Sequence, residues 1–237
     1  MKNTEERKYV VMSSFFDMDS PFMRFLNKVA DMVILNFVAL ICCIPIFTIG
    51  ASLTALHYVC LKIARGEEGY IIRSFFKSFK LNFKQATAIW MMFLGMFAIL
   101  FVDFWFLRGM EGTFSTVLLC ILLIATAIIL FTLTFVFPVL SKFDNTVWRT
   151  IKNAFFISIL QLPRTIVMIV VNILPFVMLY YAKAAPFALL FGLSVPALLG
   201  GFLYDKFFAK LEGREETQGE AKEENIDEEA DIKTETE

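Results

Sequence analysis

The feature that most constrains this chain is the length of its uncharged apolar stretches. Gly112–Ser141 runs for 30 residues without a charged side chain, and Gln85–Val102, Thr165–Ala182 and Ala184–Tyr204 are also free of charge. A helix that crosses the hydrocarbon core of a bilayer needs about 20 predominantly apolar residues. The chain therefore predicts an all-α fold, a polytopic transmembrane helix bundle.

The first apolar block predicts a helical hairpin. Met32–Leu61 carries no Lys, Arg, Asp or Glu and is too long for one upright helix. Pro45 and Gly50 lie near its middle, where proline removes a helix hydrogen bond and glycine permits a turn. We therefore expect two helices here, at about residues 25–45 and 48–65. A re-entrant first block, with five spans in all, is the alternative.

Composition and charge divide the chain into an apolar body and an acidic tail. Apolar residues make up 58% and charged residues 19% of the chain, against about 45–50% and about 25% in soluble domains. Residues 1–211 hold 19 Lys and Arg and 11 Asp and Glu, whereas residues 212–237 hold three and 12 and no aromatic residue. These values exclude a soluble cytosolic domain, a disulfide-rich secreted module and a nucleic-acid-binding protein. The predicted organisation is an N-terminal cytosolic segment (1–21), a transmembrane domain (22–211) and a disordered acidic tail (212–237).

The positions of Lys and Arg orient the predicted spans. If both termini are cytosolic, 20 of the 22 Lys and Arg residues lie on the inner side, and only Arg108 and Lys183 lie outside. This asymmetry agrees with the positive-inside rule and predicts a cytoplasmic-membrane protein with cytosolic N- and C-termini. The six predicted spans are about residues 25–45, 48–65, 86–107, 114–138, 165–182 and 185–204.

Two segments between the spans predict cytosolic interfacial amphipathic helices. In Gly69–Lys84, apolar residues recur at steps of three and four, and four cations form the opposite stripe. We expect this helix to lie in the inner interface and to favour anionic lipid head groups. The second segment is Trp148–Leu162, with Trp148 and Ile159 on its apolar side. The predicted lipid-facing cations of the first segment are Arg73, Lys77, Lys80 and Lys84.

Ionisable side chains at membrane depth are costly, so each is a candidate for function. His57 is the only histidine and the deepest ionisable group. We expect it to pack against Asn36, Thr54 or a backbone carbonyl across the hairpin, and a proton or ligand role is the alternative. Asp31 lies three residues after Lys28, a spacing that predicts a structural ion pair.

Two features of the last spans concern helix packing. Asn172 precedes Pro175 by three residues, which predicts a kink at the proline, or alternatively a broken helix that lines a substrate site. Gly192, Pro196 and Gly200 recur every four residues and predict a smooth stripe for close helix packing.

The sequence indicates no catalytic chemistry. It lacks the HExxH, GxSxG and P-loop motifs. It also has no Cys/His spacing suited to zinc, so we expect no metal and no cofactor. The chain is thus predicted not to be an enzyme. The four cysteines are expected to be buried thiols; they are Cys42, Cys43, Cys60 and Cys120.

The first third of the chain resembles a known family. The pattern opens with Pro21-Phe-Met-Arg-Phe-Leu-Asn-Lys-Val-Ala-Asp31 and continues through Cys-Cys-Ile-Pro-Ile-Phe-Thr-Ile-Gly50-Ala-Ser-Leu-Thr-Ala-Leu-His-Tyr58. It then runs through Lys62-Ile-Ala-Arg-Gly-Glu-Glu-Gly69 into Phe-Phe-Lys-Ser-Phe-Lys-Leu-Asn-Phe-Lys-Gln85. Over about residues 20–90 the chain resembles the YesL-like family of bacterial integral membrane proteins, and the likeness is weaker over 140–165.

The resemblance implies a context and no residue roles. Proteins of this kind are expected beside ATP-driven sugar importers, as accessory components of carbohydrate or oligosaccharide uptake. The partners it implies are membrane lipids and permease subunits of such an importer, and no nucleic acid. An independent small-molecule transporter or channel, and a membrane partner of a sensor kinase, are the alternatives.

The candidate ligand or partner residues lie mainly in the first hairpin and the loop after it. The Arg-Gly-Glu-Glu-Gly run lies where a cytosolic partner could contact it; alternatively it is a polar turn in which Gly66 ends the helix. The candidates are Asn36, Pro45, Gly50, His57, Arg65, Gly66, Glu67, Glu68, Asn172 and Pro175.

Overall fold

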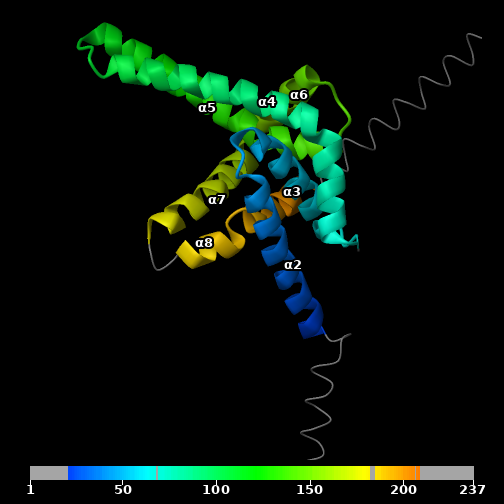
Figure 1. Cartoon of the computed structure of the whole chain (residues 1–237). Helices are drawn as coiled ribbons and strands as arrows, with labels where there is room; N and C mark the ends of the chain where they lie inside the picture. The colour runs from blue at the N-terminus through cyan, green and yellow to red at the C-terminus, as the bar shows by residue number, and fades with distance from the viewer. Residues whose placement is uncertain (1–20, 68, 182–184, 206, 209–237) are drawn as a thin grey trace, which may run out of the picture.

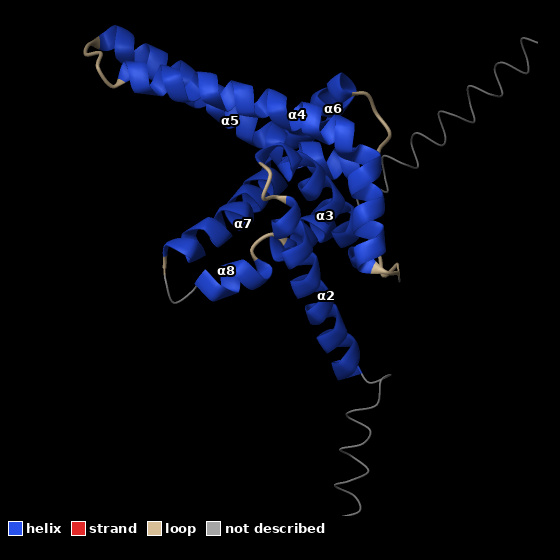
Figure 2. Ribbon diagram, viewed as in Figure 1, coloured by secondary structure: helices blue, strands red, loops and turns tan. Residues whose placement is uncertain are grey.

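The computed structural model describes residues 21–67, 69–181, 185–205 and 207–208, and every regular element in these residues is a helix (Figures 1 and 2). The predicted all-α class is confirmed for this part of the chain. The predicted acidic tail, nearly all of the N-terminal segment, and Glu68 lie outside the described residues. The elements are α2 (Pro21–Cys42), η1 (Ile46–Thr48), α3 (Ile49–Ala64), α4 (Ile71–Leu107), α5 (Thr113–Lys142), α6 (Val147–Leu160), α7 (Leu162–Tyr180), α8 (Ala185–Phe191) and a further helical segment, Ser194–Asp205, called the C-terminal segment below.

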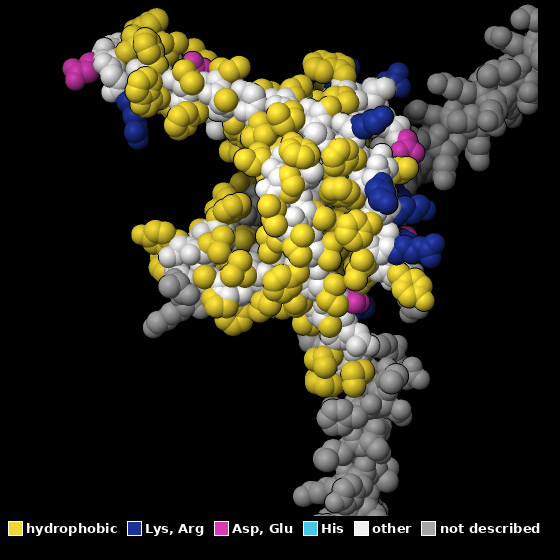
Figure 3. Space-filling view, viewed as in Figure 1, with side chains coloured by type: hydrophobic (Ala, Val, Ile, Leu, Met, Phe, Trp, Pro, Cys, Tyr) yellow, Lys and Arg dark blue, Asp and Glu magenta, His cyan; other side chains and the backbone are white. Residues whose placement is uncertain are grey.

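Helix α3 lies at the centre, and two pairs of helices project from it. Helices α4 and α5 run side by side as one long arm, and α7 and α8 form a second arm in another direction (Figure 1). The surface of both arms is largely apolar, whereas Lys and Arg side chains gather at the opposite side, near the start of α4 (Figure 3). This distribution fits a protein whose arms contact lipid.

Four helices are long and apolar enough to cross a membrane, and a bent pair makes a fifth candidate. The four are Ile46–Ala64, Ile71–Leu107, Thr113–Lys142 and Leu162–Tyr180, and the pair is α8 with the C-terminal segment. The described chain thus has four to five candidate spans. Helix α2, which covers the first predicted span, is not among them.

The predicted break at Pro45 is present, but Gly50 has a different role from the one expected. The turn after α2 is closed by Thr48, whose hydroxyl donates to the carbonyl oxygens of Cys42 (2.6 Å) and Pro45 (2.7 Å). Gly50 is helical within α3. A Cβ atom on Gly50 would lie 2.6 Å from the carbonyl oxygen of Ala86 on α4. The glycine is therefore needed for the close approach of α3 and α4, and the prediction that it permits a turn is wrong.

Helix α4 contains two elements that the sequence predicts separately. The predicted interfacial helix over 69–84 and the predicted span over 86–107 form one helix of 37 residues. At about 1.5 Å per residue, this helix is far longer than a hydrocarbon core of about 30 Å. Its first part runs in a different direction from the remainder (Figure 1). The predicted division into two helices is thus wrong, and the four predicted cations are all exposed on α4. Whether this part of α4 lies in the membrane interface stays a prediction.

Helix α6 presents mainly polar and small residues to the bundle. On its predicted apolar side, Trp148 is 72% exposed and Ile159 is also exposed, whereas Ile151 packs against the core. Whether that side lies in a membrane interface stays a prediction. The packed face consists of Thr150, Ala154, Ile157 and Ser158.

The last predicted span is broken. Helix α8 and the C-terminal segment meet at an angle of 54° around Gly192. The predicted small-residue packing is present after this break: a Cβ atom on Gly200 would lie 3.1 Å from Met168 on α7, and one on Gly201 would lie 3.4 Å from the carbonyl oxygen of Cys60 on α3. Among the cysteines, Cys60 is buried, whereas Cys120 is exposed, contrary to prediction.

Candidate functional site

The break between α8 and the C-terminal segment is held by a side chain from α2. Asn36 is fully buried, and its Nδ2 donates to the carbonyl oxygen of Leu189 (2.7 Å). Its Oδ1 accepts from the backbone N–H groups of Leu193 (2.8 Å) and Ser194 (3.1 Å). A helix end leaves such backbone groups without intrahelical partners, and each is expensive to bury unpaired. One amide side chain therefore satisfies both ends of the break.

We call Asn36 and its three hydrogen bonds the Asn36 clamp. Small and polar groups surround it. The Cys60 thiol lies 3.7 Å from the carbonyl oxygen of Ser194, and both residues are fully buried. The Ser194 hydroxyl has no hydrogen-bond partner within the described structure. A Cβ atom on Gly192 would lie 3.3 Å from the ring of Pro175. Pro175 of α7 thus contacts the break, although it lies inside a continuous helix and does not itself interrupt one.

His57 contacts a partner that the sequence does not predict for it. Its Nδ1 lies 3.1 Å from the Tyr204 hydroxyl, on the C-terminal segment. Asn36 and Thr54, the partners expected for the imidazole, bond elsewhere: Thr54 donates to the carbonyl oxygen of Gly50 (2.8 Å). The predicted packing role of His57 thus has a different partner, and that partner joins α3 to the C-terminal segment.

The ends of α3 and the C-terminal segment are joined by an ion pair. Arg65 Nε lies 2.5 Å from Asp205 Oδ1, and both side chains are about one-quarter exposed (20% and 29%). Gly66 follows with φ of 71°, and the N–H groups of Gly66 and Glu67 donate to the carbonyls of Ile63 and Lys62. This is the glycine-terminated helix end that the sequence predicts.

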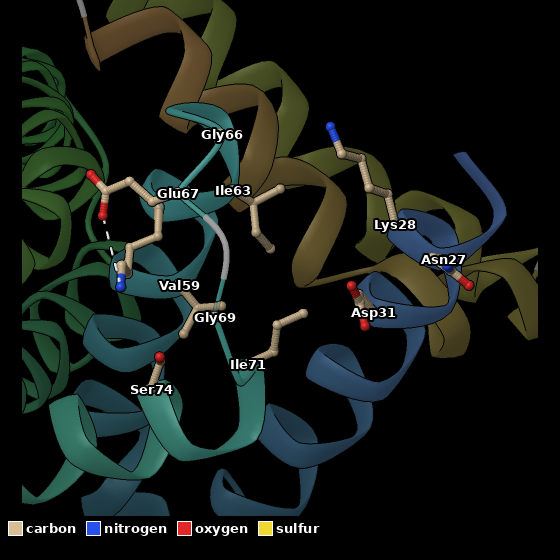
Figure 4. Close-up of a pocket in the computed structure, with 11 residues that line it drawn as sticks. Asn27, Lys28, Asp31, Val59, Ile63, Gly66, Glu67, Gly69, Ile71 and Ser74 are labelled. Carbon is tan, nitrogen blue, oxygen red and sulfur yellow. Dashed lines mark ion pairs between the residues drawn. The ribbon is translucent and has the colours of Figure 1, made fainter. Parts of the chain in front are cut away.

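A pocket of about 450 Å³ lies beside this helix end, between α2, the end of α3 and the start of α4 (Figure 4). We call this region, with Lys62, Arg65 and the cations at the start of α4, the basic end. The pocket has apolar walls from Val59, Ile63 and Ile71. Its polar lining consists of Asn27, Lys28, Asp31, Lys62, Glu67 and Ser74.

The charges in the pocket do not pair as predicted. Lys62 Nζ lies 3.7 Å from Glu67 Oε2. Lys28 extends away from Asp31, and no ion pair joins these two described residues (Figure 4). The predicted Lys28–Asp31 ion pair is therefore wrong. The Asp31 carboxylate instead points toward Ile63 and Ile71 (Figure 4).

The remaining candidates are dispersed. Pro45 is exposed in the turn after α2, and Asn172 is exposed on α7, far in sequence from the Asn36 clamp. Glu68 lies outside the described residues. Arg73, Lys77, Lys80 and Lys84 are exposed along the first part of α4. The structure thus brings Gly66 and Glu67 to the pocket, and joins Asn36, His57 and Arg65 to the C-terminal part of the chain.

Three residues that supply contacts of that part are not predicted from the sequence: Ser194, Tyr204 and Asp205. A signal for the break is present in Gly192-Leu-Ser-Val-Pro196, because glycine ends helices, whereas serine and proline begin them. Asp205 is an acid among the basic residues that follow the last span, which also marks it as a candidate partner for a cation.

Comparison with known proteins gives one match. The family described as "Protein of unknown function, DUF624" matches residues 32–104, about a third of the chain, and YesL-like proteins belong to that family. The matched residues run from α2 through α3 to the far part of α4. No curated protein and no solved structure matches the chain.

Proposed function

We propose that this chain is a non-catalytic accessory component of carbohydrate or oligosaccharide uptake, working beside an ATP-driven sugar importer in a bacterial cytoplasmic membrane. The YesL-like resemblance implies this role. The family match over 32–104 supports the resemblance, because it overlaps the region in which the likeness is dense.

The observation that carries the proposal is the free basic row on α4. Arg73, Lys77, Lys80 and Lys84 are exposed, and no ion pair within the described structure engages them. A basic helix at head-group level attracts anionic lipid, and it can also contact the acidic surface of a neighbouring subunit. A row of this kind beside a polar pocket is a surface suited to a permease partner.

The proposal includes a topology of six spans with cytosolic termini, in which α2 crosses the membrane before α3. The positive-inside distribution supports it. Single cysteines at Lys80 and Arg108 in a cysteine-free background test it, with a membrane-impermeant maleimide added to intact cells. We expect labelling at position 108 only. Labelling at position 80 would overturn the topology.

The role itself is tested by affinity purification from native membranes in a mild detergent. We expect permease subunits of a sugar importer to co-purify with the wild-type chain, and to be lost with K77Q/K80Q but retained with R108Q at the far end of α4. Recovery of the chain alone would contradict the proposal. Deletion that changes transcriptional induction without changing the uptake rate would favour the sensor-kinase partner instead.

A second candidate function is an independent small-molecule transporter. The broken last span favours it, because discontinuous helices in transporters expose backbone groups at the substrate site. Purified chain in proteoliposomes, without importer subunits, should then accumulate a labelled substrate. Uptake that is no faster than in empty liposomes over a panel of sugars and amino acids would remove this candidate.

A further inference from the structure

The pocket at the basic end contains one carboxylate that no described residue neutralises. Asp31 is half-buried and makes no hydrogen bond or ion pair with any described residue. Its carboxylate faces the apolar side chains of Ile63 and Ile71 (Figure 4). A charge in such a position favours a ligand that carries the opposite charge.

The cations of the pocket are separated from this carboxylate. Lys62 is engaged by Glu67, and Lys28 extends away from Asp31 along a different wall (Figure 4). The pocket therefore offers a negative site and a positive site that do not cancel each other. A simple anion would meet the Asp31 carboxylate, and a simple cation would meet two lysines, whereas a zwitterion satisfies both sites.

The surroundings indicate that this zwitterion carries apolar chains. The pocket opens at the basic end, where lipid head groups lie if the arms cross a bilayer. On α2, which supplies Asp31, the apolar side chains of Leu26 and Ile34 are 48% and 44% exposed. Apolar surface on this helix thus lies next to the polar lining, as the two parts of a phospholipid require.

We propose that this pocket binds the head group of a zwitterionic aminophospholipid. Its primary ammonium group donates hydrogen bonds to the Asp31 carboxylate, which lines the pocket. Its phosphate lies toward Lys28. The assignment does not rest on a role in sugar uptake, and it goes beyond general contact with anionic lipid.

Native mass spectrometry of the full chain in a nonionic detergent tests the assignment with phosphatidylethanolamine and phosphatidylcholine. The two lipids carry the same charges and differ only in the N–H donors that the N-methyl groups replace. Because a primary ammonium group donates charge-assisted hydrogen bonds that a trimethylated one cannot, we expect the ethanolamine lipid to be retained about tenfold more strongly. D31N should abolish this preference, and D144N, which changes an exposed carboxylate between α5 and α6, should preserve it.

Three results would overturn the assignment: equal retention of the two lipids, stronger retention of phosphatidylglycerol, or an unchanged preference in D31N. Displacement of the lipid by soluble phosphoethanolamine at equal concentration would show that the pocket binds the free head-group compound and not the lipid. If D31N does not fold, K28Q provides the second test, with weaker retention of both zwitterionic lipids and an unchanged ratio between them. These readouts use the isolated chain, so failure of the partner purification does not affect them.

Discussion

The span made of η1 and α3 (Ile46–Ala64) and helix α5 are both long enough to cross a membrane, yet they are buried to very different degrees. In the most apolar 18-residue window of each span, 56% is buried in the span that contains α3 and only 11% in α5. Helix α3 carries Ser52, Thr54 and His57, whereas α5 has no charged residue before Lys142. In a soluble protein the more apolar helix would be the more buried one. The reverse order indicates that lipid, and not a protein core, surrounds most of α5.

The contrast shows which residues hold this bundle together. Lipid tails are as apolar as leucine, so apolar side chains alone do not drive helices to associate in a membrane. Close contacts between small residues and buried hydrogen bonds drive this association, and both are concentrated on α3 and its neighbours. Even α5 follows this rule, because its buried part, Phe135–Ser141, is where it approaches the centre. Four substitution pairs test whether the centre and the arms differ in this way.

The largest effect is expected at the break in the last span. Asn36→Ala removes one donor and one acceptor and leaves three backbone groups unpaired in a buried site. At about 1 kcal/mol for each hydrogen bond between helices in a membrane, the free energy of unfolding should fall by about 3 kcal/mol. Asn172→Ala, on the exposed surface of α7, should change it by less than about 0.5 kcal/mol. Unfolding in mixed micelles of SDS and a nonionic detergent measures both.

A contact between α3 and α4 should give the next largest effect. Gly50→Ala forces its new Cβ against the Ala86 carbonyl and the Trp90 side chain, so we expect a loss of about 2 kcal/mol. Gly95 lies in the arm formed by α4 and α5, and no atom would lie within 4 Å of a Cβ atom added there. Gly95→Ala should therefore be neutral or stabilising by up to about 0.8 kcal/mol, through helix propensity. Equal losses at both glycines would contradict the difference in packing between the centre and the arm.

Local features of the sequence predict local features of the fold. Hydrophobic run length places helices over 114–138 and 165–182; the first segment lies within α5, and the second begins within α7, which ends at Tyr180. Gly66 ends α3 because only the adjacent backbone decides a helix cap. The same reasoning fails at residue 84, because nothing in the helical periodicity requires α4 to stop between its amphipathic and its apolar part.

The tertiary contacts of the candidate site are less accessible to such reasoning. Asn36 bonds to residues 153 to 158 positions away, and His57 bonds to Tyr204, so nearest-neighbour patterns name the side chain and not its partner. For Lys28 and Asp31 the error is the opposite one, because the sequence pattern names a partner that the structure does not provide. Their spacing on one helix permits an ion pair, but Lys28 is exposed to solvent, where pairing stabilises little, and the structure orients the two side chains to different walls of the pocket.

The Arg65–Asp205 pair should have a smaller effect than either core contact. Because both side chains are partly exposed, water screens the attraction, and we expect a coupling energy of about 1 kcal/mol. The double-mutant cycle of Arg65→Gln and Asp205→Asn isolates this energy from other interactions of Arg65. The coupling should shrink at high ionic strength. A coupling above about 3 kcal/mol would mean that the pair is shielded from solvent, and that the basic end is closed in the intact protein.

The smallest effect is expected where a buried hydrogen bond lies within well-packed aromatic rings. Tyr204→Phe removes the hydroxyl that lies 3.1 Å from His57, but the ring keeps its contact with Phe208 at a centroid distance of 4.8 Å. We therefore expect a loss of about 0.5 to 1 kcal/mol, compared with no change for Tyr180→Phe, because Tyr180 is 85% exposed on α7. His57→Phe should give a similar loss, and the double variant should lose no more than either single one, because the same bond is removed each time. Additive losses would instead show that His57 and Tyr204 each have a further polar partner, and the transporter hypothesis would then gain a buried polar site beside the broken span.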